Sequence, residues 1–182
     1  MTEQRVVFNH TFEGLFLNAL GARVTPRLKQ RLADEAHVNL DRLLPAYPIE
    51  DWQRAVQVTV EELYPALAVE EAYTEIGRQV IAGYFETLMG RALAAMVRVL
   101  GPERTLRRLE RSMRGANNYT KSSLTEVTSR RFVVTVNEPG LTRYVLRGIL
   151  LGGLTLAGAQ GLKVEVTRVD GDTSTYEVTW SA

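Results

Sequence analysis

The hydrophobic pattern of this chain changes period about two thirds of the way along. Up to about residue 118, apolar residues recur mostly at the spacings of three and four that are typical of helices. The most apolar part runs from Glu75 to Leu100, and from Val80 onward its apolar residues face nearly every direction. Such a segment belongs inside a domain rather than on its surface. We therefore predict one long central helix, beginning near Val69, around which the rest of the domain packs.

Glycine and proline positions delimit the other helices of the first part. Glycine favours helix ends and proline is tolerated in the first helical turn, so these residues mark where one helix stops and the next begins. The predicted helices are Phe12–Leu20 before Gly21, Pro26–Ala36 after the cap Thr25, Ile49–Tyr64 between Pro48 and Pro65, and Pro102–Asn117 after Gly101.

The remaining third alternates between apolar and polar residues. Arg131–Val136 is β-branched and ends at an Asn-Glu-Pro-Gly turn. The clearest β signal is a hairpin of segments 162–167 and 175–180 around Asp170-Gly171-Asp172, because alternation is regular on both sides of the turn. Between these strands, Leu141–Ala159 has the pattern of another apolar helix.

This order of elements predicts an α+β fold. An N-terminal helical half surrounds the long central helix, and a C-terminal antiparallel sheet carries one inserted helix. We expect a single domain over residues 1–182, with its helical part at about 1–118 and its sheet and helix at about 119–182.

Two glycines in the predicted central helix need a packing reason. Gly83 and Gly90 are seven residues apart and would share one helix face, with Ala94 four residues further on. Glycine inside a helix costs about 0.5–1 kcal/mol relative to alanine. We therefore expect another helix or a ligand to approach this face closely.

Composition excludes several classes of protein. The 182 residues are 45% hydrophobic and 24% charged, which is typical of a globular domain with one hydrophobic core. The absence of cysteine excludes disulfides, thiolate metal sites and cysteine nucleophiles. The start of the chain lacks the apolar core of a signal peptide, and the longest uncharged run, Gly148–Leu162, is too short to cross a bilayer. We expect a cytoplasmic protein that does not enter membranes.

Charge is distributed unevenly. Residues 32–75 hold ten acids against two arginines, whereas residues 101–131 hold eight bases against three acids. This segregation creates a dipolar surface or lets the two halves neutralise each other. The basic residues of the helix after Gly101 recur every three or four positions and form one stripe: Arg104, Arg107, Arg108, Arg111 and Arg114.

The arginine stripe has several interpretations. It is the solvated face of an amphipathic helix whose Leu106, Leu109 and Met113 are buried, or it binds an acidic protein partner or a second copy of the chain. Nucleic acid is disfavoured, because the formal net charge is +1 and no aromatic residues are interleaved with the arginines.

Three segments carry a resemblance to known families. EIGRQVIAGYF at 75–85, SMRGA at 112–116 and LTRYVLRGILLGG at 141–153, followed by a hairpin, resemble the heme nitric-oxide/oxygen-binding (H-NOX) domain. The same order of elements is similar to the 4-vinyl-reductase and TRAPP-component group. Overall the chain most closely resembles an uncharacterised family found mainly in myxobacteria. The resemblance implies an H-NOX-like fold and a bacterial signalling setting.

The heme chemistry of the H-NOX family does not carry over. The resemblance places the family's proximal histidine on the helix at Pro102–Asn117, which holds no histidine and has Leu106 or a neighbour at the matching position. Its propionate motif, Tyr-x-Ser-x-Arg, falls near Val136–Gly140, where this chain has Val-Asn-Glu-Pro-Gly. His10 and His37 are distant in sequence, and the pair His10 and Glu13 lacks a third metal ligand. We expect neither heme nor metal.

No enzymatic motif is present. Nucleophile-elbow, phosphate-loop and dinucleotide-binding patterns are absent. The sequence therefore predicts a non-enzymatic bacterial sensor or regulatory module with a heme-free pocket for a small apolar ligand. The residues expected to line that pocket are Tyr84, Phe85, Leu88, Met89, Leu93, Met96, Leu106 and Tyr144.

The alternative is a protein-interaction scaffold with a filled core, which self-associates as a homodimer or binds an acidic partner through the Arg104–Arg114 helix. An enclosed cavity of about 300 Å³ or more favours the pocket. A filled interior with an exposed apolar patch favours the scaffold.

Overall fold

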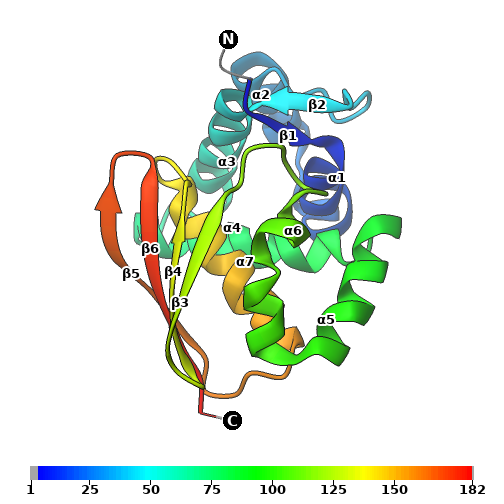
Figure 1. Ribbon diagram of the computed structural model, residues 1–182. Coiled ribbons are helices and arrows are strands. Elements are labelled where there is room, and N and C mark those ends of the chain that lie inside the picture. Colours follow the sequence, from blue (N-terminus) through cyan, green and yellow to red (C-terminus); the bar gives the residue numbers. More distant parts are fainter. Residues whose placement is uncertain (1–3, 182) are drawn as a thin grey trace.

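The computed structural model describes residues 4–181, in which a sheet and a group of helices lie on either side of one helix, α7 (Figure 1). The helices are α1 (Asn9–Phe12), the π-helix η1 (Glu13–Ala19), the 3₁₀ helix η2 (Gly21–Arg23), α2 (Pro26–Ala36), α3 (Ile49–Leu63), α4 (Val69–Tyr84), α5 (Leu88–Arg107), α6 (Leu109–Met113) and α7 (Thr142–Leu156). The strands are β1 (Val6–Phe8), β2 (Ala46–Pro48), β3 (Ser122–Thr128), β4 (Arg131–Val136), β5 (Lys163–Asp170) and β6 (Thr173–Thr179). The predicted α+β fold with an antiparallel sheet and an inserted helix is confirmed.

The helix α2 shows how local signals fix an element. The Thr25 hydroxyl accepts a hydrogen bond from the Leu28 amide at 3.1 Å, and Pro26 occupies the first helical position. The helix ends where His37 adopts a left-handed conformation. Both ends lie where the sequence predicts them, because cap and proline act within a single turn.

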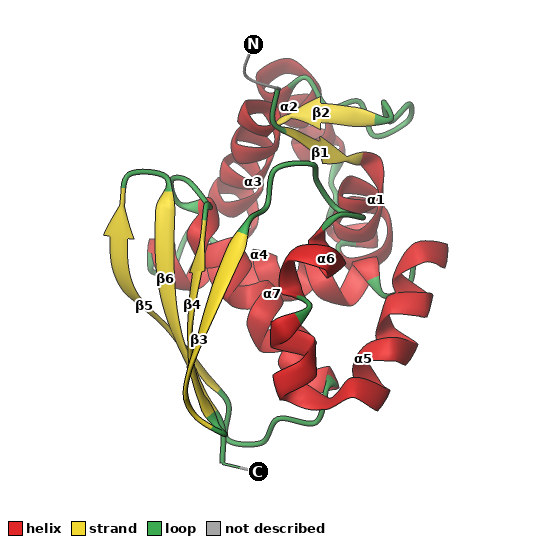
Figure 2. Ribbon diagram, in the orientation of Figure 1, coloured by secondary structure: helices red, strands yellow, loops and turns green. Residues whose placement is uncertain are grey.

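The four-stranded sheet is antiparallel throughout, in the order β3-β4-β6-β5 (Figure 2). Alternate residues of the central strands, such as Phe132 and Val134 on β4 and Val178 on β6, are fully or almost fully buried. They belong to one hydrophobic cluster with Leu146 and Leu150 of α7. The period of two in the sequence therefore marks the face of the sheet that packs on α7.

The helices α4 and α7 approach so closely that both need glycine at the contact. A Cβ added to Gly77 would fall on the Val145 carbonyl and 2.8 Å from the Gly148 Cα. One added to Gly148 would fall on the Thr74 carbonyl. Glycine at both positions therefore allows the two helix backbones to touch.

The expected single central helix is wrong. The chain forms two helices, α4 and α5, that are bent by 100° across Phe85–Thr87. Thr87 begins α5, because its hydroxyl accepts a hydrogen bond from the Gly90 amide at 3.0 Å and donates one to the Tyr84 carbonyl at 2.7 Å. Of these two helices, α4 runs through the interior, whereas α5 has exposed apolar side chains, including Leu88 and Val99.

The bend also separates the two glycines that were expected on one helix face. Gly83 lies on α4, where an added Cβ would fall on the carbonyl of Gly14 in η1. Gly90 lies on α5, where an added Cβ would fall on the Tyr84 carbonyl. Each glycine therefore permits a close backbone contact, but the two contacts are different ones.

The sequence analysis did not predict three of the strands. The strands β1 and β2 form a separate two-stranded antiparallel sheet, and β3 is an edge strand whose residues are mostly exposed. Short or exposed strands lack the regular alternation that identifies the hairpin.

Within residues 4–181, no single helix is both long and apolar enough to cross a membrane. The bent pair α4 and α5 meets that criterion only when the two helices are taken together.

Candidate ligand-binding cavity

A partly open cavity of about 100 Å³ lies among α4, α5, α6 and α7 and extends toward β1 and α3. Most of its walls are apolar. The apolar side chains come from all these elements: Val7, Trp52, Val80, Ile81, Phe85, Leu93, Val97, Leu106, Leu109, Met113, Ala116, Val145, Leu146, Ile149, Leu150 and Leu154.

Four of the eight residues predicted to line a pocket do line this cavity. They are Tyr84 and Phe85 at the α4–α5 bend, Leu93 on α5, and Leu106 near the end of α5. The bend at Phe85–Thr87 and the non-helical conformation of Gly101 inside α5 bring them together, and the end of α5 lies beside α7 (Figure 1).

The other four predicted residues lie elsewhere. Leu88 and Met89, at the start of α5, are 86% and 54% exposed. Met96 does not line the cavity, and its sulfur accepts a hydrogen bond from Arg108. The Tyr144 hydroxyl donates a hydrogen bond to Glu70 at 2.6 Å. Leu88 and Met89 lie outside the cavity because α5 leaves the direction of α4 at Phe85–Thr87.

The cavity has one carboxyl group among its lining residues, that of Glu138. Glu138 comes shortly after the end of strand β4 and is only 5% exposed. Burial raises the pKa of Glu138 to about 7, although hydrogen bonds from Thr142 and Tyr119 act in the opposite direction. Sequence reasoning did not single out Glu138, because an acid in an Asn-Glu-Pro-Gly turn is normally exposed.

Other polar groups also border the cavity. Burial raises the pKa of Tyr119, so its phenol stays protonated and can donate to Glu138. The hydroxyl of Thr105 is buried and has no hydrogen-bond partner within the described chain. The cavity therefore combines apolar walls with polar groups that the protein itself does not fully satisfy.

The predicted arginine stripe is exposed along its whole length. Leu106 and Leu109 are buried beneath it, as expected for an amphipathic helix, although the segment is divided between α5 and α6. Arg107 pairs with Glu103 at 2.9 Å and with Glu126 at 2.5 Å, and its guanidinium lies 5.8 Å from the Phe132 ring centroid.

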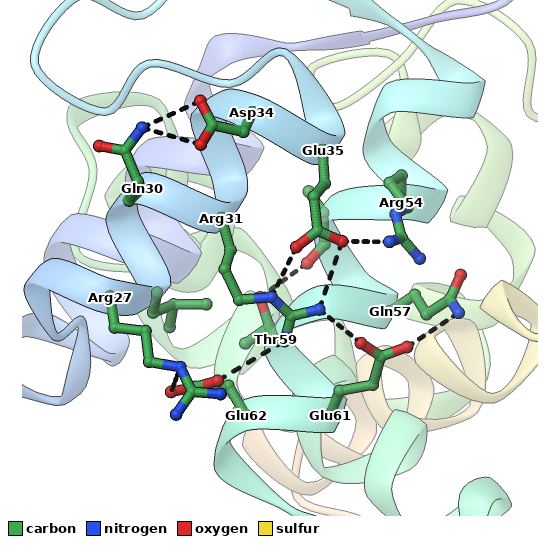
Figure 3. A network of polar contacts seen from close by, with 12 residues as sticks. Arg27, Gln30, Arg31, Asp34, Glu35, Arg54, Gln57, Thr59, Glu61 and Glu62 are labelled. Carbon is green, nitrogen blue, oxygen red and sulfur yellow. Dashed lines mark hydrogen bonds and ion pairs between the residues drawn. The ribbon is translucent and has the colours of Figure 1, made fainter.

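The acids of residues 32–75 form many of their ion pairs with nearby arginines and not with the arginine stripe. Figure 3 shows acids of α2 and α3 around arginines of the same two helices. Arg31 contacts Glu35 at 2.6 Å and Glu61 at 2.7 Å, while Arg54 also pairs with Glu35. Arg31 stands just before the acid-rich segment, so a charge count that starts at residue 32 omits it. The stripe and the acidic segment are therefore not each other's main partners.

Neither histidine borders the cavity. His10 lies on α1, 3.7 Å from Glu13, and His37 is 3.0 Å from Asp51. Across residues 4–181, no group of three or more His, Cys, Asp or Glu side chains is arranged to hold a metal ion.

The fold is that of H-NOX domains. The structure is similar to that of an H-NOX protein from S. oneidensis in its Fe(II)NO state, with a TM-score of 0.73 and 10% identity over 96% of this chain and 99% of that one. It is also similar to an unliganded Fe(II) H-NOX protein mutant from K. algicida, with a TM-score of 0.68 and 9% identity over 96% and 97% of the two chains. An oxygen-binding H-NOX domain related to soluble guanylate cyclases has a TM-score of 0.65 and 14% identity over 96% and 93%.

The sequence itself identifies the family to which the chain belongs. Residues 5–181 match the model of DUF2378, a family described as proteins of unknown function, and the chain belongs to that family. No curated protein matches the sequence.

The residues around the cavity do not fit the heme that the fold implies. A volume of about 100 Å³ is smaller than the about 150 Å³ of an engineered cavity that holds one benzene, so a porphyrin has no room. No histidine lines the cavity within the described chain. Its charged lining group, Glu138, would repel heme propionates when ionised. The cavity of this chain therefore lacks the volume for a porphyrin and a histidine on its wall.

Proposed function

We propose that this protein is a non-enzymatic sensor or regulatory module whose internal cavity binds a small, mostly apolar ligand in place of heme. The observation that carries the proposal is the mostly apolar, partly open cavity among α4, α5, α6 and α7. A dry apolar space loses packing contacts, and a ligand of matching size regains them. The sequence carries no nucleophile-elbow, phosphate-loop or dinucleotide-binding motif, which supports binding rather than catalysis.

The size of the cavity limits the ligand. Ordinary ligand pockets measure about 300–1,000 Å³, so this cavity falls below the size that the sequence-based criterion requires. It is about two thirds of the volume that accommodates benzene or xenon in an engineered core. We propose ligands of only a few non-hydrogen atoms.

A pair of matched variants on α5 tests the proposal. Val97 lines the cavity and is 4% exposed, whereas Val99 on the same helix is 85% exposed. Xenon titrated into the wild-type protein should give saturable NMR shifts at cavity residues. Val97→Phe fills the space and should abolish these shifts, whereas Val99→Phe should retain them.

Two results would contradict the cavity proposal. They are an absence of saturable xenon shifts in the wild type and equal binding by both phenylalanine variants. Where overpacking unfolds Val97→Phe, Val97→Leu fills less of the space and should weaken binding. Native mass spectrometry of protein purified from its own organism would then identify the natural ligand.

An exposed apolar face on α5 favours a second candidate function, self-association. Leu88, Ala92, Ala95 and Val99 are all exposed and follow the spacing of four, three and four of a coiled-coil seam. The alanines leave room for a second copy of the same helix to approach. We therefore propose, as the second candidate, a scaffold that self-associates through this face of α5.

The self-association candidate has its own experiment. Sedimentation should show a concentration-dependent dimer that Leu88→Glu with Val99→Glu disrupts. Val169→Glu places the same charge at an exposed position on β5 and should leave the dimer intact. A wild-type protein that is monomeric at all concentrations would exclude this candidate.

A further inference from the structure

Glu138 lacks a cationic partner inside the protein. It is the charged residue among those that line the cavity, and within residues 4–181 no lysine, arginine or histidine lies within ion-pair distance of it. Arg5, which acts on Glu138 through its charge, pairs with Asp172 at 3.0 Å instead. The cavity thus contains an acid whose negative charge the fold does not balance.

The polar groups near Glu138 come from four parts of the chain. Thr142 on α7 and Tyr119 after α6 supply hydroxyls that lower its pKa, and Arg5 before β1 lowers it through its charge. Tyr176 on β6 stays neutral, because burial raises its pKa. Hydroxyl groups can donate to a carboxylate, but they do not neutralise it. The desolvation of a buried charge therefore persists, and this desolvation raises the pKa of Glu138 to about 7.

We propose that the cavity takes a small alkylamine, whose ammonium group pairs with the Glu138 carboxylate and whose hydrocarbon chain packs on the apolar walls. The proposal rests on the proposed function, because it specifies the ligand class for the same cavity. The unpartnered hydroxyl of Thr105 also borders the cavity and indicates that its polar groups are not satisfied by the protein alone.

Other ligand charges fit this site less well. An anion would be repelled by ionised Glu138. A neutral alcohol would hydrogen-bond but would leave the buried negative charge unbalanced. An ammonium supplies both the charge and the donors, and a short chain matches a cavity smaller than the about 150 Å³ that holds benzene.

The experiment compares n-butylamine, n-butanol and butyrate, which have chains of similar length and carry positive, neutral and negative heads. Binding to the full chain is followed by NMR shifts at pH 8, where an alkylammonium with a pKa of about 10.4 is still charged. We expect n-butylamine to bind at least about tenfold more tightly than n-butanol, because truncating a buried charge pair typically costs more than that. Butyrate should bind most weakly.

Two variants identify the group responsible. Glu138→Gln keeps the shape of the side chain and should abolish the preference for the amine while leaving n-butanol binding unchanged. Glu165→Gln removes the same charge from an exposed position on β5 and should keep the preference. In the wild type, amine affinity should fall as pH drops from 8 to 5.5, because Glu138 gains a proton.

The outcomes separate the two proposals. Equal binding of n-butylamine and n-butanol, or a preference that survives Glu138→Gln, would overturn the amine inference while n-butanol binding still supports the cavity. No binding of any probe, together with no xenon shifts, would overturn the proposed function as well. If Glu138→Gln does not fold, the pH profile of the wild type decides the inference, and a flat profile overturns it.

Discussion

At the scale of single residues, the buried carboxyl of Glu138 links stability to pH. Its pKa rises from 4.5 to about 7 on folding, so the folded state holds this proton more tightly than the unfolded state. The resulting stabilisation is fully present below about pH 4.5 and is lost as pH rises through about 7. A tenfold difference in proton affinity between the two states corresponds to about 1.4 kcal/mol.

Glu138→Gln should therefore gain stability over the wild type as pH rises from about 4.5 to about 7. We expect the variant to match the wild type near pH 4 and to exceed it at pH 8 by up to about 3 kcal/mol in the free energy of unfolding. Urea denaturation at pH 4, 6 and 8 measures the difference, with Glu165→Gln as the exposed control. A variant that is less stable than the wild type at pH 8 would mean that Glu138 has a cationic partner after all.

At the scale of elements, close helix contacts depend on particular glycines. An added Cβ at Gly83 on α4 would collide with the backbone of Gly14, whereas one at Gly153 on α7 meets no atom within 4 Å. We expect Gly83→Ala to destabilise the protein by more than about 1 kcal/mol through overpacking. Gly153→Ala should stabilise it by about 0.5–1 kcal/mol, because alanine is the better helix former.

Thermal and urea unfolding of both alanine variants provide the measurement. The paired design removes helix propensity as an explanation, since both changes improve it equally. Equal stabilisation in both variants would show that η1 does not pack against α4 at this point.

The arginine stripe on α5 and α6 is expected to contribute little to folding. Arg104, Arg108 and Arg111 are exposed and make no ion pair within the described chain, so changing them together to glutamine should leave the unfolding temperature nearly unchanged. Arg107 differs, because it connects Glu103 on its own helix with Glu126 on β3. Adding Arg107→Gln to the triple variant should lower the unfolding temperature more than the other three changes do together.

Calorimetry of the triple and quadruple variants distinguishes these contributions. A cooperative loss of folding in the triple variant would show that the stripe is paired internally, and it would leave an acidic partner no surface to bind. An unchanged triple variant keeps that surface available for such a partner.

Elements whose signals are local were predictable from the sequence, and those set by tertiary contacts were not. A threonine cap and a proline define α2, and regular alternation defines the β5–β6 hairpin. The α4–α5 bend has no glycine or proline at Phe85–Thr87. Its one local signal is Thr87, whose capping role is visible only once the helix is known to start there.

At the scale of the whole molecule, the general position of the cavity was predictable and its chemistry was not. The apolar segment from Val80 to Leu100 indicated a possible ligand pocket around the predicted central helix, and four of the predicted lining residues, Tyr84, Phe85, Leu93 and Leu106, line the cavity. The key carboxyl of Glu138 was missed, because its burial depends on α7 and on the segment after α6 closing over it. Sequence periodicity cannot reveal contacts between segments that are this far apart.

The fold and the missing heme chemistry lead to one prediction for the whole protein. Hemin added to purified protein should give no sharp Soret band and no stoichiometric uptake, because the cavity is too small and its lining carries a carboxylate where heme propionates need donors. Leu106→His places an imidazole on the cavity wall and should also fail, since space as well as an axial ligand is missing. Stoichiometric uptake by Leu106→His alone would mean that the cavity expands readily and that only the ligand was lost. Uptake by the wild type that His10→Ala or His37→Ala abolishes would instead show an axial ligand from the N-terminal helices, which requires a rearrangement of α1 or α2 toward the cavity.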